Sequence, residues 1–181
     1  MAWELQNSGM LERRKMLAMI GGAVGGAVAI AAMEMLSTRT MFPLMAIPFA
    51  TSIVLVMGAP ETEPAQPRAL IGGHLISTLV GLLAVHVAGP GLWVAAHVAG
   101  PGLWVAALSV GLAMVAMHLT RTFHPPAGID PLVIVINEMP WTFLIVPVGV
   151  GALMLAAFAL VWHWLVDRST SSERSWPRRW W

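Results

Sequence analysis

Long apolar stretches without charged residues dominate the chain. No Asp, Glu, Lys or Arg occurs from Ala69 to Thr120 or from Met139 to Val166. A helix of about 20 apolar residues crosses the ~30 Å hydrocarbon core of a bilayer. The pattern predicts four long transmembrane helices, at roughly 16–36, 70–88, 102–119 and 142–166.

Two further apolar stretches are too short to span a bilayer as straight helices. Phe49 to Met57 follows Pro43 and Pro48, and Leu132 to Ile136 follows Pro125, Pro126 and Pro131. Prolines at these places break or start helices. We expect two short broken or re-entrant half-helices, and therefore an all-α integral membrane protein of four long transmembrane helices plus two half-helices.

Two internal repeats suggest how these helices are organised. T-R-T-M-F-P at 38–43 resembles T-R-T-F-H-P at 120–125, and each leads from a long span into a half-helix and then into another long span. This predicts two similar halves, about 16–88 and 102–166. H-V-A-G-P-G-L-W-V-A-A occurs at 86–96 and again at 97–107. Because Gly-Pro-Gly breaks helices, we expect this exact duplication to lengthen a loop.

Composition restricts the class of protein. Hydrophobic residues make up 57% of the chain and charged residues 10%, against about 25% charged in soluble domains. There is no cysteine for disulfide or thiolate chemistry, and no basic patch that would indicate nucleic acid. The histidines lack the spacing of a metal site, and no catalytic motif is present. We expect no enzyme activity, no cofactor and no metal.

Positive residues predict the orientation. Arg13, Arg14 and Lys15 precede the first span, and four arginines follow the last, at 168, 174, 178 and 179. The positive-inside rule then places segments 1–15 and 167–181 in the cytoplasm, around a transmembrane domain at 16–166. Four spans with two re-entrant segments satisfy this, and so do six crossings. The expected location is a bacterial inner (plasma) membrane, and the partners are the lipid bilayer and a small-molecule or ion substrate.

Paired half-helices in repeated halves point to a transport site. Free N–H groups at the start of a half-helix favour an anion. We expect segments 48–53 and 124–131 to approach each other at mid-membrane, line a polar cavity and bind a small anion where their N-termini meet. Arg39 and Arg121 would add positive charge. Alternatively, both arginines extend from span ends to the interface.

H-P-P-A-G at 124–128 resembles the HPP family of integral membrane proteins. P-F-A-T-S-I-V-L-V-M-G-A-P at 48–60, A-Q-P-R at 65–68 and I-G-G-H-L-I-S at 71–77 support the resemblance, which covers roughly 16–166. It implies a four-spanning probable transporter, and nitrite is a substrate proposed for some relatives. Ala50 replaces a usual glycine, and Asp130 lies in I-D-P where A-T-A is more usual. Asp130 would cap the second half-helix and compete with an anion; it could instead relay a proton or bind a cation.

The remaining candidates are polar residues next to the half-helices. His124 could couple transport to protons, or bond to a carbonyl that the prolines leave free. Gly72 and Gly73 indicate a close helix contact beside His74. Gln66 and Arg68 belong to a loop that could fold over the site, although Arg68 could also pair with Glu61 or Glu63. The candidate substrate-binding residues are Arg39, Thr51, Ser52, Gln66, Arg68, His74, Arg121, His124, Pro125, Pro126, Gly128 and Asp130.

Two functions follow. The first is a transporter or channel for a small solute, with a small inorganic anion such as nitrite preferred. The alternative is a non-transporting membrane module that binds a partner or forms a homo-oligomer. Its support is G-G-A-V-G-G-A at 21–27, whose spacing of small residues suits close helix packing.

Overall fold

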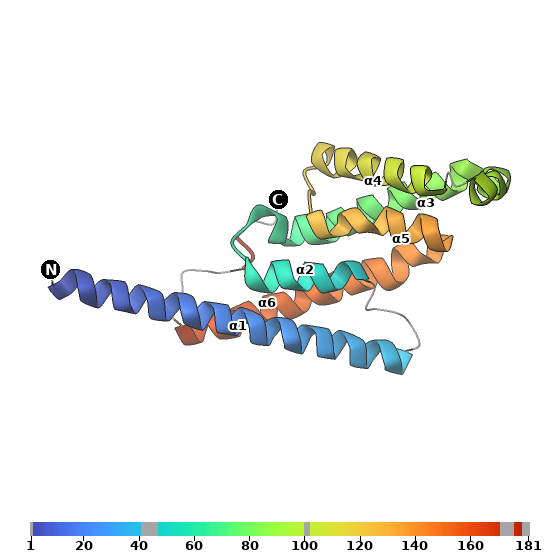
Figure 1. Cartoon of the computed structure of the whole chain (residues 1–181). Helices are drawn as coiled ribbons and strands as arrows, with labels where there is room; N and C mark the ends of the chain where they lie inside the picture. Colours follow the sequence, from blue (N-terminus) through green and yellow to red (C-terminus); the bar gives the residue numbers. More distant parts are fainter. Residues whose placement is uncertain (1, 41–46, 100–101, 171–175, 179–181) are drawn as a thin grey trace.

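The computed structural model describes residues 2–40, 47–99, 102–170 and 176–178, and its regular elements there are helices (Figure 1). Six are α-helices: α1 Ala2–Thr40, α2 Ile47–Gly58, α3 Pro67–Ala99, α4 Gly102–Leu119, α5 Asp130–Asn137 and α6 Val150–Thr170. Four are short helical turns: η1 Glu63–Ala65, η2 Pro125–Ile129, η3 Trp141–Leu144 and η4 Ile145–Gly149. The expected half-helices are α2 and α5, and α5 begins directly after the prolines of η2.

Three of the four expected spans are long and apolar enough to cross a membrane. They are Ser8–Met35, Pro67–Val87 and Trp141–Val166. The fourth, predicted at 102–119, forms α4 of 18 residues, and its described apolar part is the shorter Trp104–Leu119. The chain is therefore an all-α membrane protein with three long spans and shorter apolar helices in the described residues.

Polar and apolar side chains are arranged for a lipid surrounding. On α4, Leu108, Leu112 and Leu119 are 67%, 61% and 81% exposed. In contrast, Ser52, His74, His124 and Asp130 have no exposed surface. Large apolar side chains at the outer surface cost nothing against acyl chains, whereas polar groups in hydrocarbon must find partners inside the bundle. The outward-facing leucines are thus a lipid-facing surface.

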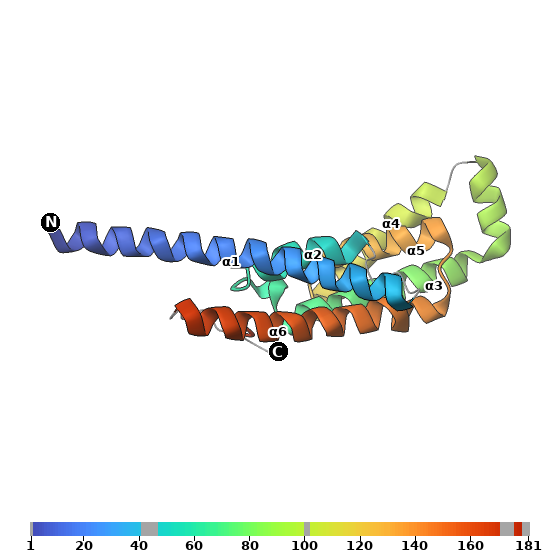
Figure 2. The same ribbon diagram turned by 90° about the horizontal axis from the view of Figure 1, so that it is seen from below.

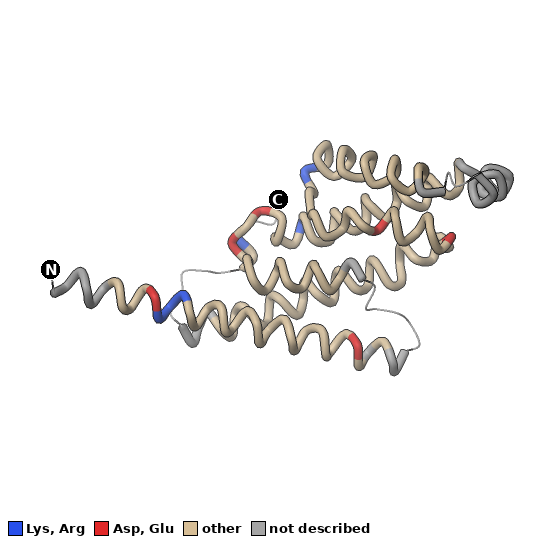
Figure 3. Tube along the Cα trace, in the orientation of Figure 1, with Lys and Arg blue, Asp and Glu red and all other residues tan. Residues whose placement is uncertain are grey.

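Consecutive α-helices run in alternating directions along the bundle (Figures 1 and 2). Helix α2 returns to the end towards which the N-terminus of α1 projects, so η1 and residues 176–178 lie at that end. The described Lys and Arg residues gather there too (Figure 3). We refer to this end as the basic end.

The duplicated segment differs from the expectation of a loop. Helix α3 continues through the first copy as far as Ala99, and α4 begins at Gly102 inside the second copy. Figure 2 shows the far end of α3 turning away from the bundle. A proline inside a helix removes one backbone hydrogen bond, and this can bend a helix without ending it.

Three glycines let α3 approach the segment before and within α5. A Cβ at Gly72 would lie 2.5 Å from Thr122 Cγ2, and one at Gly73 would lie 2.6 Å from His124 Cβ. A Cβ at Gly81 would lie 2.8 Å from Pro131 Cα. Real Cβ atoms do not come so close to other carbon atoms. The glycines therefore confirm the close contact expected beside His74, and they bring the T-R-T-F-H-P-P segment against α3.

Glycines of α1 serve contacts within the same chain. A Cβ at Gly22 would lie 2.5 Å from the Met57 carbonyl oxygen of α2, and one at Gly25 would lie 2.4 Å from Trp162 Nε1 of α6. Trp162 Nε1 also donates to the Gly21 carbonyl at 3.2 Å. Much of the G-G-A-V-G-G-A face is thus occupied by α2 and α6, which removes its main support for an oligomer contact.

The α3 contact can be tested with two glycine substitutions. Gly73→Ala should destabilise the protein by ~1–3 kcal/mol, because the added methyl group overlaps the backbone of the His124 segment. Gly111→Ala on α4 is the matched control, since its Cβ would meet nothing within 4 Å. It should be neutral or stabilise by up to ~1 kcal/mol through helix propensity. Thermal unfolding in detergent measures both, and equal effects would contradict the close packing.

Candidate functional site

Four buried polar side chains form a continuous hydrogen-bonded chain inside the bundle, which we name the histidine network: Asp130, His74, Ser52 and His124. Asp130 Oδ2 lies 2.8 Å from His74 Nδ1. His74 Nε2 lies 2.8 Å from Ser52 Oγ, and Ser52 Oγ lies 2.9 Å from His124 Nε2. The network joins α2 and α3 to the segment that starts the second half-helix.

The break in the helix before and at the start of α5 determines where His124 and Asp130 lie. His124 is extended (φ −131°, ψ 96°) directly before Pro125 and Pro126, as expected for a residue that precedes proline. Asp130 is the first residue of α5, one residue before Pro131. The interruption directs Asp130 to His74 and Thr78 of α3, and His124 to Ser52 of α2 and the Pro64 carbonyl. Broken backbone of this kind is stable inside a membrane only where protein surrounds it.

Hydroxyl groups of α3 support the network. Thr78 Oγ1 donates to Asp130 Oδ2 at 3.2 Å, and Ser77 Oγ donates to the Ala127 carbonyl of η2 at 2.6 Å. Both residues were absent from the sequence prediction. Their spacing in the sequence could have indicated them, because residues three and four positions after His74 lie on the same face of a helix.

The far end of the network closes on the loop before α3. His124 Nδ1 donates to the Pro64 carbonyl at 2.7 Å, so this nitrogen carries a hydrogen. His124 therefore bonds to a carbonyl near a proline, as one interpretation of the sequence proposed, but Pro64 is 60 residues away along the chain.

Asp130 does not cap the second half-helix as expected. The N-cap position of α5 is Ile129, without a side-chain cap, and the Asp130 carboxylate turns to His74 and Thr78. An imidazole N–H offers a stronger partner than a neutral backbone group in a low-dielectric interior. Asp130 Oδ1 is buried, and no described residue hydrogen-bonds to it.

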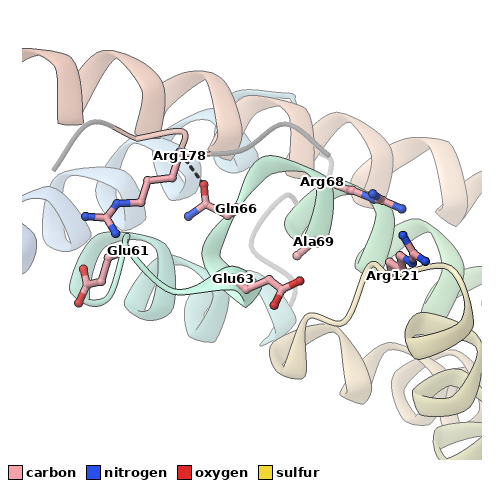
Figure 4. Close-up of a pocket in the computed structure, with 7 residues that line it drawn as sticks. All are labelled: Glu61, Glu63, Gln66, Arg68, Ala69, Arg121 and Arg178. Carbon is pink, nitrogen blue, oxygen red and sulfur yellow. Dashed lines mark hydrogen bonds between the residues drawn. The ribbon is translucent and has the colours of Figure 1, made fainter.

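An open pocket of about 400 Å³ lies at the basic end, which we name the arginine pocket (Figure 4). Its lining residues are Glu61, Glu63, Gln66, Arg68, Ala69, Arg121 and Arg178. Three arginines against two glutamates leave a positive excess. Figure 4 shows the Arg68 and Arg121 guanidinium groups together on one side. Arg68 Nη2 donates to the Thr120 carbonyl at 3.0 Å and, within the described chain, pairs with neither Glu61 nor Glu63.

Arg121 has an unusual backbone conformation. Its φ of 56° lies in the left-handed region, at the position after α4 where glycine is the usual residue. Its N–H donates to the His118 carbonyl, and the next N–H, of Thr122, donates to that of Met117. A non-glycine residue here costs about 1–2 kcal/mol. Among the described residues its side chain has no hydrogen-bond or ion-pair partner. Such local strain is found at functional sites more often than elsewhere.

The described C-terminal residues hold the loop that borders this pocket. Trp176 is 4% exposed and donates from Nε1 to the Ala65 carbonyl at 3.0 Å. The Arg178 backbone N–H donates to Gln66 Oε1 at 2.8 Å, and Gln66 Nε2 donates to the Pro60 carbonyl. Nothing in the sequence indicated this contact, because it joins segments 111 residues apart.

Segments 48–53 and 124–131 approach each other as expected, but the space beside their contact is apolar. A groove of about 630 Å³ is lined by Thr51, Leu55, Thr62, Pro64, Pro125, Pro126 and Ile129. The polar groups pack against one another within the network instead. The prediction that the two segments line a polar cavity is therefore wrong for this groove. The reason is that buried polar groups gain more from hydrogen bonds with one another than from facing hydrocarbon. The N-termini of α2 and α5 also do not meet; Ser52, in the second turn of α2, makes the contact.

The remaining predicted residues take no part in these groups. Gly128 is half-buried in η2, with open space at its Cβ position. The Arg39 side chain lies outside the described residues. His74, His124, Ser52 and Asp130 share the network, while Arg68, Gln66 and Arg121 share the arginine pocket. The sequence thus named the members without indicating this division.

The chemistry available to the network is proton exchange. Asp130, His74 and Ser52 stand in the order of a Ser-His-Asp triad. However, Ser52 has no exposed surface and a second histidine holds its hydroxyl. No group of three metal-binding side chains occurs among the described residues. Buried Asp and His inside a membrane domain are costly and mark proton or solute pathways.

Comparisons with known proteins agree with this architecture. A family model described as "HPP, transmembrane region" matches residues 11–173. Two curated transmembrane proteins of Dictyostelium discoideum are each 36% identical over 137 residues, which is 74% of this chain and 40% and 44% of theirs. The chain thus spans about two fifths of the length of these relatives. No solved structure matches it. With most of its length inside the family model, the chain belongs to the HPP family of transmembrane proteins.

Proposed function

We propose that this protein transports a small inorganic anion, such as nitrite, across a membrane. The observation that carries the proposal is that the arginine pocket and the histidine network are built from neighbouring residues of the same two segments. In the loop before α3, Glu63 and Gln66 line the pocket, while Pro64 between them accepts a hydrogen bond from His124 of the network. In the segment after α4, Arg121 lines the pocket and lies three residues before His124. A transported anion would meet positive charge first and titratable groups next.

Arg68 and Arg121 explain the preference for an anion. Two guanidinium groups side by side repel each other, and a bound anion relieves the repulsion. Arginine offers paired N–H donors that suit planar oxyanions such as nitrite, nitrate and formate. The openness of the pocket to solvent at the basic end gives these ions access.

The membrane arrangement that we propose has six crossings and both ends of this chain in the cytoplasm. The alternating helix directions and the basic end support it. Helices α2 and α5 are each too short to cross the hydrocarbon alone, so the chain next to them completes these two crossings. The two similar halves are then inverted relative to each other, as in many transporters. We propose a plasma membrane, the inner membrane in a bacterial cell, as the location.

Anion flux into proteoliposomes tests the function. Wild-type protein should move nitrite, and we would compare nitrate, formate and chloride. Arg121→Gln should reduce flux ~10–100-fold, because one charge-assisted hydrogen bond to the anion is lost. Arg121→Gly should reduce flux equally and yet raise stability by about 1 kcal/mol, since glycine removes the left-handed strain.

The pair of Arg121 variants separates function from folding, because a more stable protein that no longer transports has not failed to fold. Arg14→Gln, which removes an exposed arginine of α1 outside the pocket, is the control and should transport normally. Absence of flux for every anion with folded wild-type protein would exclude anion transport and favour the non-transporting module.

Cysteine labelling tests the arrangement in the membrane, since the chain has no native thiol. Glu63→Cys at the basic end and Thr142→Cys on η3 are both exposed positions. With six crossings, a membrane-impermeant maleimide should label position 142 on intact cells and position 63 only after lysis. Labelling of position 63 from outside would instead show a re-entrant first half-helix.

A further inference from the structure

We propose that the histidine network is a proton-binding site that holds at least one extra proton in this structure, and that the transported anion moves together with this proton. The coupling step rests on the proposed function; the proton site itself does not. The inference comes from counting hydrogens along the network, and it assigns a co-transported ion that the arginine pocket alone does not indicate.

Three contacts of the network each need one hydrogen between the two heavy atoms. They are Asp130 Oδ2 with His74 Nδ1, His74 Nε2 with Ser52 Oγ, and Ser52 Oγ with His124 Nε2. At 2.8–2.9 Å, two facing lone pairs would repel each other. Each contact is therefore a hydrogen bond only if one of its atoms donates.

The groups in their ordinary forms supply too few hydrogens. The Ser52 hydroxyl supplies one, and a neutral His74 supplies one. A neutral His124 has a single N–H, already used at Nδ1 because the Pro64 carbonyl can only accept. An ionised Asp130 supplies none. Two hydrogens serve three contacts, so one more proton is needed. If Ser52 also donated to another acceptor, the network would need a second extra proton, so one extra proton is the minimum.

The extra proton has three alternative positions. It can reside on the Asp130 carboxyl, on His74 as an imidazolium, or on His124 as an imidazolium. Transfer from His74 to His124 passes through Ser52: His74 Nε2 gives its proton to Ser52 Oγ, and the original hydroxyl proton moves to His124 Nε2. All three contacts keep a hydrogen in each state, so proton transfer requires no movement of heavy atoms.

The two ends of the network differ. A carbonyl oxygen cannot pass a proton onward, so the network is closed at Pro64. At the other end Asp130 Oδ1 is buried and has no hydrogen-bonding partner among the described residues. The proton therefore enters and leaves at the Asp130 end, and the network stores a proton without leaking it across the membrane.

Loss of the proton would open the contact between the halves. Two hydrogens would then serve three contacts, so one contact would lack a hydrogen and become repulsive. Ser52 lies on α2, whereas His124 and Asp130 belong to the second half. An anion in the arginine pocket would favour the state with charge on His124, since Arg121 is only three residues away. Anion and proton thus stabilise the same closed form, which is the condition for coupled movement.

Other titratable groups on the packed elements do not account for the network's charge. Helices α2 and η2 carry none. On the others, the described titratable groups are Glu12, Arg13, Arg14, Lys15, Glu34, Glu63, Arg68, His86, His118, Glu138 and His163, and His163 donates to the Val56 carbonyl. The charge interaction that acts on both His124 and Asp130 is that of His74.

Histidine nitrogen NMR on the full chain in detergent tests the proton site without transport. In ¹⁵N-histidine-labelled wild type, His74 and His124 should share one extra proton and lose it together as the pH rises. Asp130→Asn supplies the third hydrogen from its amide, so this variant should fold, keep His124 protonated at Nδ1 and show no joint titration. His163→Gln, which alters a buried histidine outside the network, should titrate like the wild type.

Two results would overturn the proton site. One is that neither the charge nor the tautomer of either histidine changes with pH in the wild type. The other is that Asp130→Asn titrates as the wild type does, because a network that only stabilises the fold would not depend on an ionisable group at this position.

Proteoliposomes with an internal pH dye test the coupling. In the wild type an anion gradient should carry protons in the same direction, and a gradient of one pH unit should accumulate the anion about tenfold. Asp130→Asn should abolish this accumulation, while His163→Gln should not. Wild-type anion flux without proton movement would overturn the coupling but leave the proposed function intact. A shared proton in the NMR experiment with no flux of any anion would overturn the proposed function, and the coupling with it, but leave the proton site intact.

Discussion

The hydrogen bonds of the Ser52 hydroxyl with two buried histidines are the interaction on which the rest of this structure depends. In hydrocarbon, a polar group without a partner costs several kcal/mol, so His74, His124 and Asp130 are tolerable only when they satisfy one another. Ser52 is the member that connects them. It fixes α2 against both α3 and the segment that precedes α5, and so determines how the first half of the chain meets the second.

This contact requires backbone segments to come unusually close. Gly72 and Gly73 remove the Cβ atoms that would otherwise hold the His124 segment away from α3. The prolines that follow His124 then prevent a regular helix, so that side chains which a helix would turn elsewhere point into the bundle. Packing and chemistry are thus linked: the small residues allow the approach, and the broken helix provides the groups that meet.

The two polar regions differ in how much freedom they have. The network is fully enclosed and nearly saturated with hydrogen bonds, so its state is sensitive to a single proton. The arginine pocket is open, and its lining residues come from loop ends held by Trp176 and Gln66. Loops of this kind are the segments that move most easily. In the proposed mechanism, a ligand in the pocket and a proton in the network influence each other through the short stretch from Arg121 to His124.

The sequence by itself determined the class of the protein and the positions of most of its helices. Uncharged apolar stretches specify transmembrane helices because each satisfies its own backbone, and prolines specify where α2 and α5 begin, because both effects are local. The sequence also indicated His74, His124 and Asp130 as unusual residues in an apolar setting. Only the tertiary structure decided their partners: Asp130 turns to His74 rather than to its own helix, His124 reaches Pro64, and Trp176 packs on Ala65. These contacts join residues 56, 60 and 111 positions apart, where many partners are possible and the outcome depends on which helices pack together. The proline of the duplicated segment shows the same limit, since whether it ends α3 or only bends it depends on more than the local sequence.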